Sequence, residues 1–411
     1  MRIPCCDDIE LCDNTIDIRP VFSHRLFQRL DHVKQLGQTS RVFPGAVHTR
    51  LEHSLGVFAR TKEQCLKWYR CGLIRMTDVT TLCLFALIHD IGHFPFSHSL
   101  EPILKMNHHD NGVIILNELR DEIGACGVSV EALIRCLEGR YPLSEAVSHA
   151  LLGTDKIDYL IRDAYHTGFG GAPETKLIQA HTRPFEGGIV LEKCSQYEAL
   201  QLASFIYTMY SRVYERSKNA YSRRLMQKLF ERISSLGIME EVTLSRMTDA
   251  QFEGVCERND DERLRYFYDM YHGLHPLPWT SVMVCQNGHG LYHSRTAKTM
   301  RRVIELAPDQ FNALDAKVTW SNTGEHEERC AQIAATDPRH VFIQPSRTAK
   351  RYALPSTTLL DGANTYDLTT VVPTDTSSTE RIRFIRVGSN DKGSLKRIYD
   401  RSDDILKALM T

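Results

Sequence analysis

Long apolar runs are absent from this sequence. No segment approaches the roughly 18 consecutive apolar residues that a membrane-spanning helix requires. Residues 1–14 also carry acids where a signal peptide has its apolar core. These absences argue against a membrane anchor and against secretion, so we expect a cytoplasmic protein without membrane contacts.

An excess of either charge is absent as well. The 50 basic and 51 acidic residues leave a formal net charge of −1, so the molecule as a whole attracts neither nucleic acid nor an anionic membrane. The basic segment 212–224 leaves contact with nucleic acid or with an oligomer interface open, and a solvated helix face explains it equally well. A nucleic-acid partner therefore has no support from the composition.

The twelve cysteines include no Cys-x-x-Cys pair, the spacing that is typical of zinc and redox sites. A chain of 411 residues buries enough apolar surface to fold without disulfides. We interpret these cysteines as reduced thiols, in agreement with a cytoplasmic setting.

From the length of the chain alone, two domains are expected. Residues 20–235 show helical periodicity, with helices expected at 51–73 and 79–91 and a long helical stretch at 195–236. Later segments instead contain short β-branched runs, of which residues 381–387 alternate strictly as a half-buried strand does. We expect a helical domain at residues 1–275 and an α+β region at residues 276–411.

Four short segments concentrate histidine and acidic residues in the helical part: 50–53, 89–98, 108–110 and 155–163. A His-Asp pair at the end of a buried helix offers one nitrogen and one oxygen to a divalent ion, and this donor set suits Fe, Mn, Zn or Ni. A single His-Asp pair usually consists of hydrogen-bonded residues in the core and binds no metal. The ordered combination of a His, a His-Asp and a later Asp favours a metal site.

The segment 155–163 has a helical geometry of its own. Lys156, Tyr159 and Asp163 are spaced by three and four residues, so they share one helix face. That face offers a cation for phosphate, an aromatic ring and an acceptor for a hydroxyl group. A solvated face with internal ion pairs is the simpler explanation of this segment when it is considered alone.

Taken together, five segments resemble the HD-domain deoxynucleoside triphosphate triphosphohydrolases, a family that includes the SAM-and-HD-domain dNTPase of animals and the bacterial dGTPases. These segments are residues 27–37, 44–56, 89–98, 109–112 and 155–163. The resemblance implies a mainly α fold, an HD-domain helical bundle with a smaller α+β C-terminal region, and it includes no SAM domain.

The resemblance also implies roles for the polar residues. It assigns the metal to His53, His89, Asp90 and Asp155. It assigns catalytic work at the triphosphate to Asp155, His93, His98 and His109, with His98 or His109 as proton donor or water-orienting group. The substrate-binding residues that it implies are Gln35, Leu36, Arg50, Lys156, Tyr159, Asp163 and Tyr214.

The chain departs from the family pattern at three places. The usual Tyr-x-His-Lys is here Tyr214-Glu-Arg-Ser217, and an arginine of the family is replaced by Ile206. An arginine that serves a regulatory guanine nucleotide in the animal enzyme is here Asp31, so regulation by GTP is not expected.

The sequence thus predicts a metal-dependent phosphohydrolase, with a dNTP as substrate and deoxynucleoside plus triphosphate as products. The expected cofactor is Fe, Mn, Zn or Ni, with Mg accompanying the triphosphate, and a homo-oligomer is expected. One alternative is an HD phosphatase or phosphodiesterase acting on another nucleotide or on a nucleic-acid end. A second alternative is a nucleotide sensor without catalysis.

Overall fold

The computed structural model describes residues 1–6, 8–286, 302–345, 356–371 and 384–411. These residues form a mainly α protein with two four-stranded sheets. The predicted fold class, mainly α with a smaller α+β C-terminal region, is confirmed. Among the described helices, none combines the length and the apolar character needed to cross a membrane.

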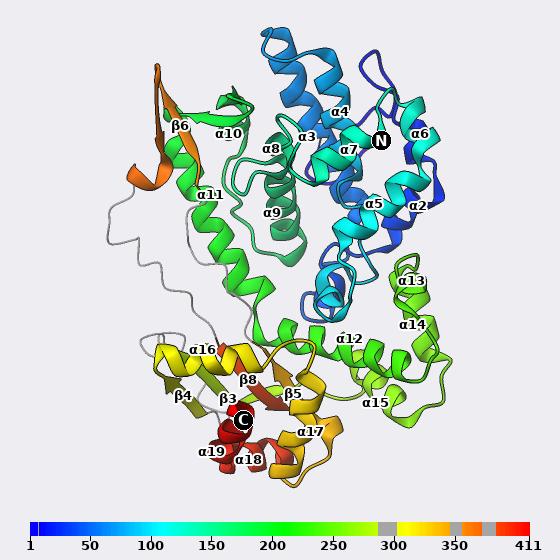
Figure 1. Cartoon of the computed structure of the whole chain (residues 1–411), viewed down its shortest axis with the longest axis vertical. Coiled ribbons are helices and arrows are strands. Elements are labelled where there is room, and N and C mark those ends of the chain that lie inside the picture. Colours follow the sequence, from blue (N-terminus) through cyan, green and yellow to red (C-terminus); the bar gives the residue numbers. More distant parts are fainter. Residues whose placement is uncertain (7, 287–301, 346–355, 372–383) are drawn as a thin grey trace.

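The blue and cyan helices of the first part of the chain fill the upper right of Figure 1. Helices α3 and α4 pack along each other, and α9 packs against α3. The bounds are α1 (Arg19–Phe22), α2 (Arg25–Gln28), α3 (Arg50–Arg70), α4 (Met76–Ile88), α5 (His108–Glu118), α6 (Arg120–Ala125), α7 (Val130–Leu137), α8 (Glu145–Ser148), α9 (Thr154–Thr167) and α10 (Lys176–His181).

Helix α3 places His53 in its first turn, as the sequence predicted. The Thr49 side chain caps this helix by accepting a hydrogen bond from the Glu52 amide at 3.3 Å. The helix ends at Arg70, a little before the predicted end, because Gly72 adopts a left-handed φ of 69°.

Helix α4 is buried over almost its whole length and ends at Ile88. The chain then turns, and at Gly92 it passes close to the start of α5. A Cβ on Gly92 would lie 2.0 Å from the carbonyl oxygen of His108, so only glycine fits there. His89 follows the last residue of α4 and His93 lies in the loop beyond the helix, so these two histidines do not share a helix face. This loop carries the candidate residues from Asp90 to His98.

One sheet unexpectedly contains strands from distant parts of the chain. Its order is β1-β2-β6-β7, with β2 parallel to β6 and the other neighbours antiparallel. The hairpin β1–β2 falls where the sequence predicted only helices; its turn has φ of 47° at Glu186 and 84° at Gly187. The strands are β1 (Thr182–Phe185), β2 (Gly188–Glu192), β6 (Thr358–Asp361) and β7 (Asn364–Asp367).

The second sheet forms the C-terminal unit at the bottom of Figure 1. Its order is β4-β3-β8-β5, with β3 parallel to β4 and antiparallel to β8. Its bounds, with the helices that accompany it, are β3 (Trp279–Gln286), β4 (Arg302–Leu306), α16 (Pro308–Lys317), α17 (Thr323–Ile333), β5 (Val341–Gln344), β8 (Phe384–Ser389), α18 (Lys392–Asp400) and α19 (Ser402–Met410).

Helix α12 connects the two parts and lies between them (Figure 1). It contacts the C-terminal strands β3 and β5 as well as the short helical turns near the candidate site. The remaining helices are α11 (Gln196–Met209), α12 (Ser217–Ser235), α13 (Glu241–Leu244), α14 (Asp249–Glu257) and α15 (Glu262–Tyr271), and a π-helical turn (Tyr210–Tyr214) follows α11.

Two predictions on the C-terminal region involve residues outside the described part. Only Phe384–Val387 of the strand expected at 381–387 lie within it, in β8. Residues 374–380 (TDTSSTE), whose composition predicts a solvated loop between strands, lie wholly outside the described residues. The predicted boundary at 275/276 stays a prediction, although the sheet β1-β2-β6-β7 takes strands from both sides of it.

Candidate functional site

A cavity of about 490 Å³ opens among α4, α9, α12 and the loop that follows α4. This volume suits a small-molecule ligand. His53 lies buried behind the wall. All the other residues predicted for the site line the cavity: Gln35, Leu36, Arg50, His89, Asp90, His93, His98, His109, Asp155, Lys156, Tyr159, Asp163 and Tyr214.

The four predicted metal ligands converge at the bottom of this cavity. Oδ1 of Asp155, on α9, lies 3.1 Å from Nε2 of His53 and 3.6 Å from Nε2 of His89. The Asp90 carboxylate lies 3.6 Å from Nε2 of His53 and 3.5 Å from Nε2 of His89. Three elements, α3, the end of α4 and α9, thus bring donor atoms from distant sequence positions to one point.

The donor atoms fit a divalent transition metal. Nδ1 of His89 donates to the Ala86 carbonyl at 2.8 Å, which leaves Nε2 as the free lone pair. That Nε2 is buried and has no hydrogen-bond partner, a costly arrangement for a polar atom unless an ion binds it. Nδ1 of His53 is likewise held by Asp158 at 2.9 Å, so both imidazoles present Nε2 to the same point.

The charges at this point favour a bound cation. Burial opposes charge on His53, but hydrogen bonds with Asp155 and Asp158 raise its pKa to about 9. Burial also opposes ionisation of Asp90, yet the Arg50 guanidinium holds the pKa of that carboxyl well below its usual range. The carboxylates therefore remain ionised and attract positive charge, which a metal ion would supply in place of the imidazolium proton.

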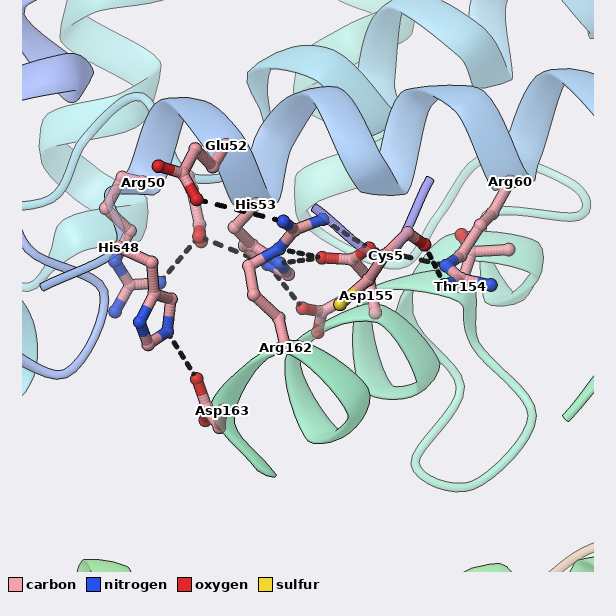
Figure 2. A network of polar contacts seen from close by, with 12 residues as sticks. Cys5, His48, Arg50, Glu52, His53, Arg60, Thr154, Asp155, Arg162 and Asp163 are labelled. Atoms are coloured by element: carbon pink, nitrogen blue, oxygen red, sulfur yellow. Dashed lines mark hydrogen bonds and ion pairs between the residues drawn. The ribbon is translucent and has the colours of Figure 1, made fainter. Parts of the chain in front are cut away.

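Behind His53 lies a second layer of charged residues, shown in Figure 2. Asp158 is fully buried and accepts from Arg162 Nε at 3.0 Å and from Arg60 Nε at 3.3 Å. These two arginines in turn donate to the backbone carbonyls of Pro4 and Cys5 at 2.9 and 3.1 Å. The N-terminal segment thus completes the polar layer that orients the predicted metal ligand.

Gly56 on α3 leaves the space that this layer needs. A Cβ at this position would lie 2.2 Å from Oδ1 of Asp158 and 2.4 Å from Nη2 of Arg162. We expect Gly56→Ala to displace the Asp158 carboxylate from His53 and to weaken metal binding about tenfold, as loss of such supporting partners usually does. Competition with a chelator measures this effect. Gly124→Ala, where a Cβ meets nothing within 4 Å, serves as the control.

Two cations face the cavity beside the four predicted metal ligands His53, His89, Asp90 and Asp155, which we call the metal-ligand cluster. Arg50 donates to Asp90 at 2.6 Å and to the Ser97 hydroxyl at 2.9 Å. Nζ of Lys156 lies 2.5 Å from the Tyr159 hydroxyl. Guanidinium and ammonium groups in a cavity of this kind are suited to phosphate oxygens.

A group of histidines lines the outer part of the cavity. His93, His98 and His108 have ring nitrogens within 4.8 Å of one another, and His109 lies against His108 with ring centroids 4.1 Å apart. Glu101 holds Nδ1 of His98 at 2.6 Å and Nδ1 of His108 at 2.5 Å. No role was predicted for His108, although it belongs to the segment 108–110, or for Glu101, which lies between that segment and the segment 89–98.

The opposite wall carries a carboxylate with two fixed partners. Asp163 accepts from Nε2 of His48 at 2.8 Å and from the Tyr214 hydroxyl at 2.6 Å. Tyr214 reaches this place from the π-helical turn after α11. Arg223 on α12 also lines this wall and was not predicted, because its place depends on how α12 packs.

Comparison with known proteins agrees with this geometry. Residues 50–163 match the family model of the HD domain. The uncharacterized protein YwfO of Bacillus subtilis is 31% identical over 222 residues, which cover 52% of this chain and 51% of YwfO. The deoxynucleoside triphosphate triphosphohydrolase SAMHD1 of Danio rerio is 30% identical over 200 residues, covering 37% of this chain and 32% of SAMHD1.

The chain spans about half the length of the first of these relatives and a third of the second. A crystal structure of a hypothetical protein from Aquifex aeolicus superposes with a TM-score of 0.68 at 20% identity, covering 96% of both chains, and this shows the shared fold. His53, His89, Asp90 and Asp155, whose side chains converge, all lie within residues 50–163, so the part of the chain that forms this cluster is similar to an HD domain.

Proposed function

We propose that this protein uses its cavity to hydrolyse deoxynucleoside triphosphates to deoxynucleoside and triphosphate. The observation that carries the proposal is the presence, in one cavity, of the metal-ligand cluster, two cations and the Asp163 carboxylate. The similarity to SAMHD1 of Danio rerio, whose name states this activity, supports the choice of substrate.

Four residues would hold the metal: His53, His89, Asp90 and Asp155. A divalent ion bound there, such as Fe, Mn, Zn or Ni, supplies Lewis acidity to a water and to a phosphate oxygen. Arg50 and Lys156 stabilise the charge that develops on the phosphate oxygens. Water attacks the α-phosphorus, the bond from phosphorus to the 5′-oxygen breaks, and His98 or His109 delivers a proton to that oxygen.

The other predicted contacts complete the substrate site. Asp163 accepts a hydrogen bond from the sugar 3′-hydroxyl, and Tyr159 packs against the sugar. Gln35 and Leu36 lie on the side of sugar and base, and Tyr214 flanks the nucleotide. Mg entering with the triphosphate, assembly into a homo-oligomer and a cytoplasmic location remain predictions from the sequence.

A nucleotide with fewer phosphates is the second candidate substrate. Three acids that line the cavity, Asp90, Asp155 and Asp163, balance its three cations, of which Arg223 is the third. The protein therefore supplies little net positive charge for a polyphosphate beyond the metal itself. A nucleic-acid end would present the same short phosphate chain. A sensor without catalysis would bind nucleotide and leave it intact.

A product screen separates these functions. The purified protein is incubated with each dNTP, each dNMP and a 5′-phosphorylated oligonucleotide, with Mn, Fe, Mg or Co, and products are resolved by mass spectrometry. We expect deoxynucleoside and triphosphate from at least one dNTP. Inorganic phosphate from the dNMP or the oligonucleotide alone would replace the proposal by the second candidate, and tight binding without product would favour the sensor.

A further inference from the structure

A buried carboxylate outside the matched HD segment touches two loops of the cavity. Asp249 is the first residue of α14 and is only 4% exposed. Its Oδ1 accepts a hydrogen bond from the Phe96 amide at 2.7 Å, and its Oδ2 accepts from the Lys34 amide at 3.0 Å. One side chain thus sets the distance between the loop before Gln35 and the loop before Ser97.

The two loops that Asp249 joins hold Arg50. Nε of Arg50 donates to the Ser97 hydroxyl at 2.9 Å, and that hydroxyl donates to the Lys34 carbonyl at 2.7 Å. The Arg50 guanidinium also donates to the Gln35 carbonyl at 3.3 Å. A chain of hydrogen bonds therefore connects Asp249, through the loops at 34–37 and 96–98, to the guanidinium of Arg50.

The backbone at residues 96–97 needs such support. Phe96 and Ser97 both adopt left-handed φ, 58° and 54°. Residues other than glycine adopt this conformation only when the surrounding structure imposes it. The hydrogen bond from the Phe96 amide to Asp249 is part of that restraint, and it lies one residue before the hydroxyl that contacts Arg50.

A buried arginine also ties the segment before α14 to the loop that follows α4. Arg29 donates to the carbonyls of Met247, Ile91 and His93 at 2.9, 3.1 and 2.7 Å. Residues 247–249 are thereby fixed to the loop that follows α4 from two sides. Asp249 cannot shift without moving a backbone that this arginine holds in place.

Keeping a carboxylate at this position is costly. Burial raises the pKa of Asp249 to about 6, in spite of its two backbone donors. A structural role in a core would be met at lower cost by an apolar side chain of similar size. A carboxylate is explained here by its two oxygens, each of which accepts from a different loop of the cavity.

We propose that Asp249 is a positioning residue for phosphate binding, which fixes the loops at 34–37 and 96–98 so that the Arg50 guanidinium faces the substrate phosphates. This inference rests on the proposed function only in requiring that the cavity binds phosphate. Asp249 does not touch the metal ligands, so its role concerns phosphate affinity and leaves metal binding to α3, α4 and α9.

The test compares Asp249→Ala with Asp261→Ala in the full chain loaded with Mn. Asp261 is the control, since it also stands at the start of a helix, as the N-cap of α15, and accepts a backbone hydrogen bond from Leu264 at 2.8 Å, in addition to its ion pair with Arg232. It does not line the cavity. We expect Asp249→Ala to weaken binding of inorganic tripolyphosphate about tenfold to a hundredfold, the usual consequence of a misplaced binding group. Metal content should stay at the wild-type value, and Asp261→Ala should bind tripolyphosphate as wild type does.

Equal tripolyphosphate affinity of the Asp249→Ala and Asp261→Ala proteins would overturn the proposal, as would loss of the metal from Asp249→Ala. If Asp249→Ala does not fold, Ser97→Ala removes the hydroxyl between Lys34 and Arg50 and should show the same loss of affinity. Unchanged affinity of the Ser97→Ala protein for tripolyphosphate would equally reject the proposal. Because binding of tripolyphosphate is measured without turnover, an inactive wild type would contradict the proposed function and leave this result interpretable.

Discussion

Asp90→Ala is expected to reduce phosphohydrolysis at least about a thousandfold and to lower the metal content. The Asp90 carboxylate lies within 3.6 Å of both imidazoles of the metal-ligand cluster and accepts from Arg50 at 2.6 Å. Removing it deletes one ligand and leaves a buried guanidinium without its counter-ion, which repels a metal ion. Initial rates, together with elemental analysis of the protein by mass spectrometry, measure the two effects.

His89→Ala should behave in the same way, because Nε2 of His89 has no other partner. Asp260→Ala removes a fully exposed carboxylate and is the matched control; it should keep both metal and activity. Removing the metal from wild type with a chelator should reproduce the Asp90→Ala result, and adding Mn back should restore only the wild type. Undiminished turnover by a metal-free Asp90→Ala protein would contradict the metal-dependent mechanism.

Glu327→Ala is expected to lower the free energy of unfolding by about 3–5 kcal/mol, the usual cost of leaving buried charge without its partner. Glu327, on α17, is 2% exposed and neutralises two buried cations of α12. It contacts Arg224 at 3.0 Å and Lys228 at 2.8 Å. It also accepts a hydrogen bond from the Ile343 amide at 2.9 Å.

Unfolding in urea measures this change. Arg224 keeps a second carboxylate, Glu231 at 2.6 Å. Lys228 keeps the Val341 carbonyl and lies over the rings of Phe267 and Phe342, but the structure gives it no second ion pair among the described residues, so we expect the loss of its counter-ion to account for most of the change. The control is Asp404→Ala, which breaks the exposed ion pair with Arg401 in the same unit and should leave stability unchanged. A loss no greater than that of the control would show that α12 and the C-terminal unit are not joined through this cluster.

Much of the helical part was predictable from the sequence because its signals are local. Helices α3 and α4 differ by only a few residues from their predicted bounds. The ordered His, His-Asp and Asp were enough to predict residues that the structure brings to one point. Their assigned roles in binding and catalysis stay predictions that the substitutions above test.

The features that were not predicted depend on long-range packing. Strand β2 of the hairpin β1–β2 pairs on its other side with β6, which is far along the chain. The sequence around the hairpin therefore carries no local pattern that predicts this sheet. Asp249 meets Phe96 and Lys34 through the packing of α14, and its own neighbourhood in the sequence contains nothing unusual. Glu101 could have been found, since it stands between His98 and His108 in the sequence.

The order of the first sheet has a consequence for synthesis of the chain on the ribosome. Strand β2 ends at Glu192, whereas its parallel partner β6 begins only at Thr358. Until β6 emerges, one edge of β2 keeps its backbone N–H and C=O groups unpaired, and such an edge invites pairing with another nascent chain. Closing so long a loop is slow, and this edge of β2 is covered only after residues 358–361 have been translated.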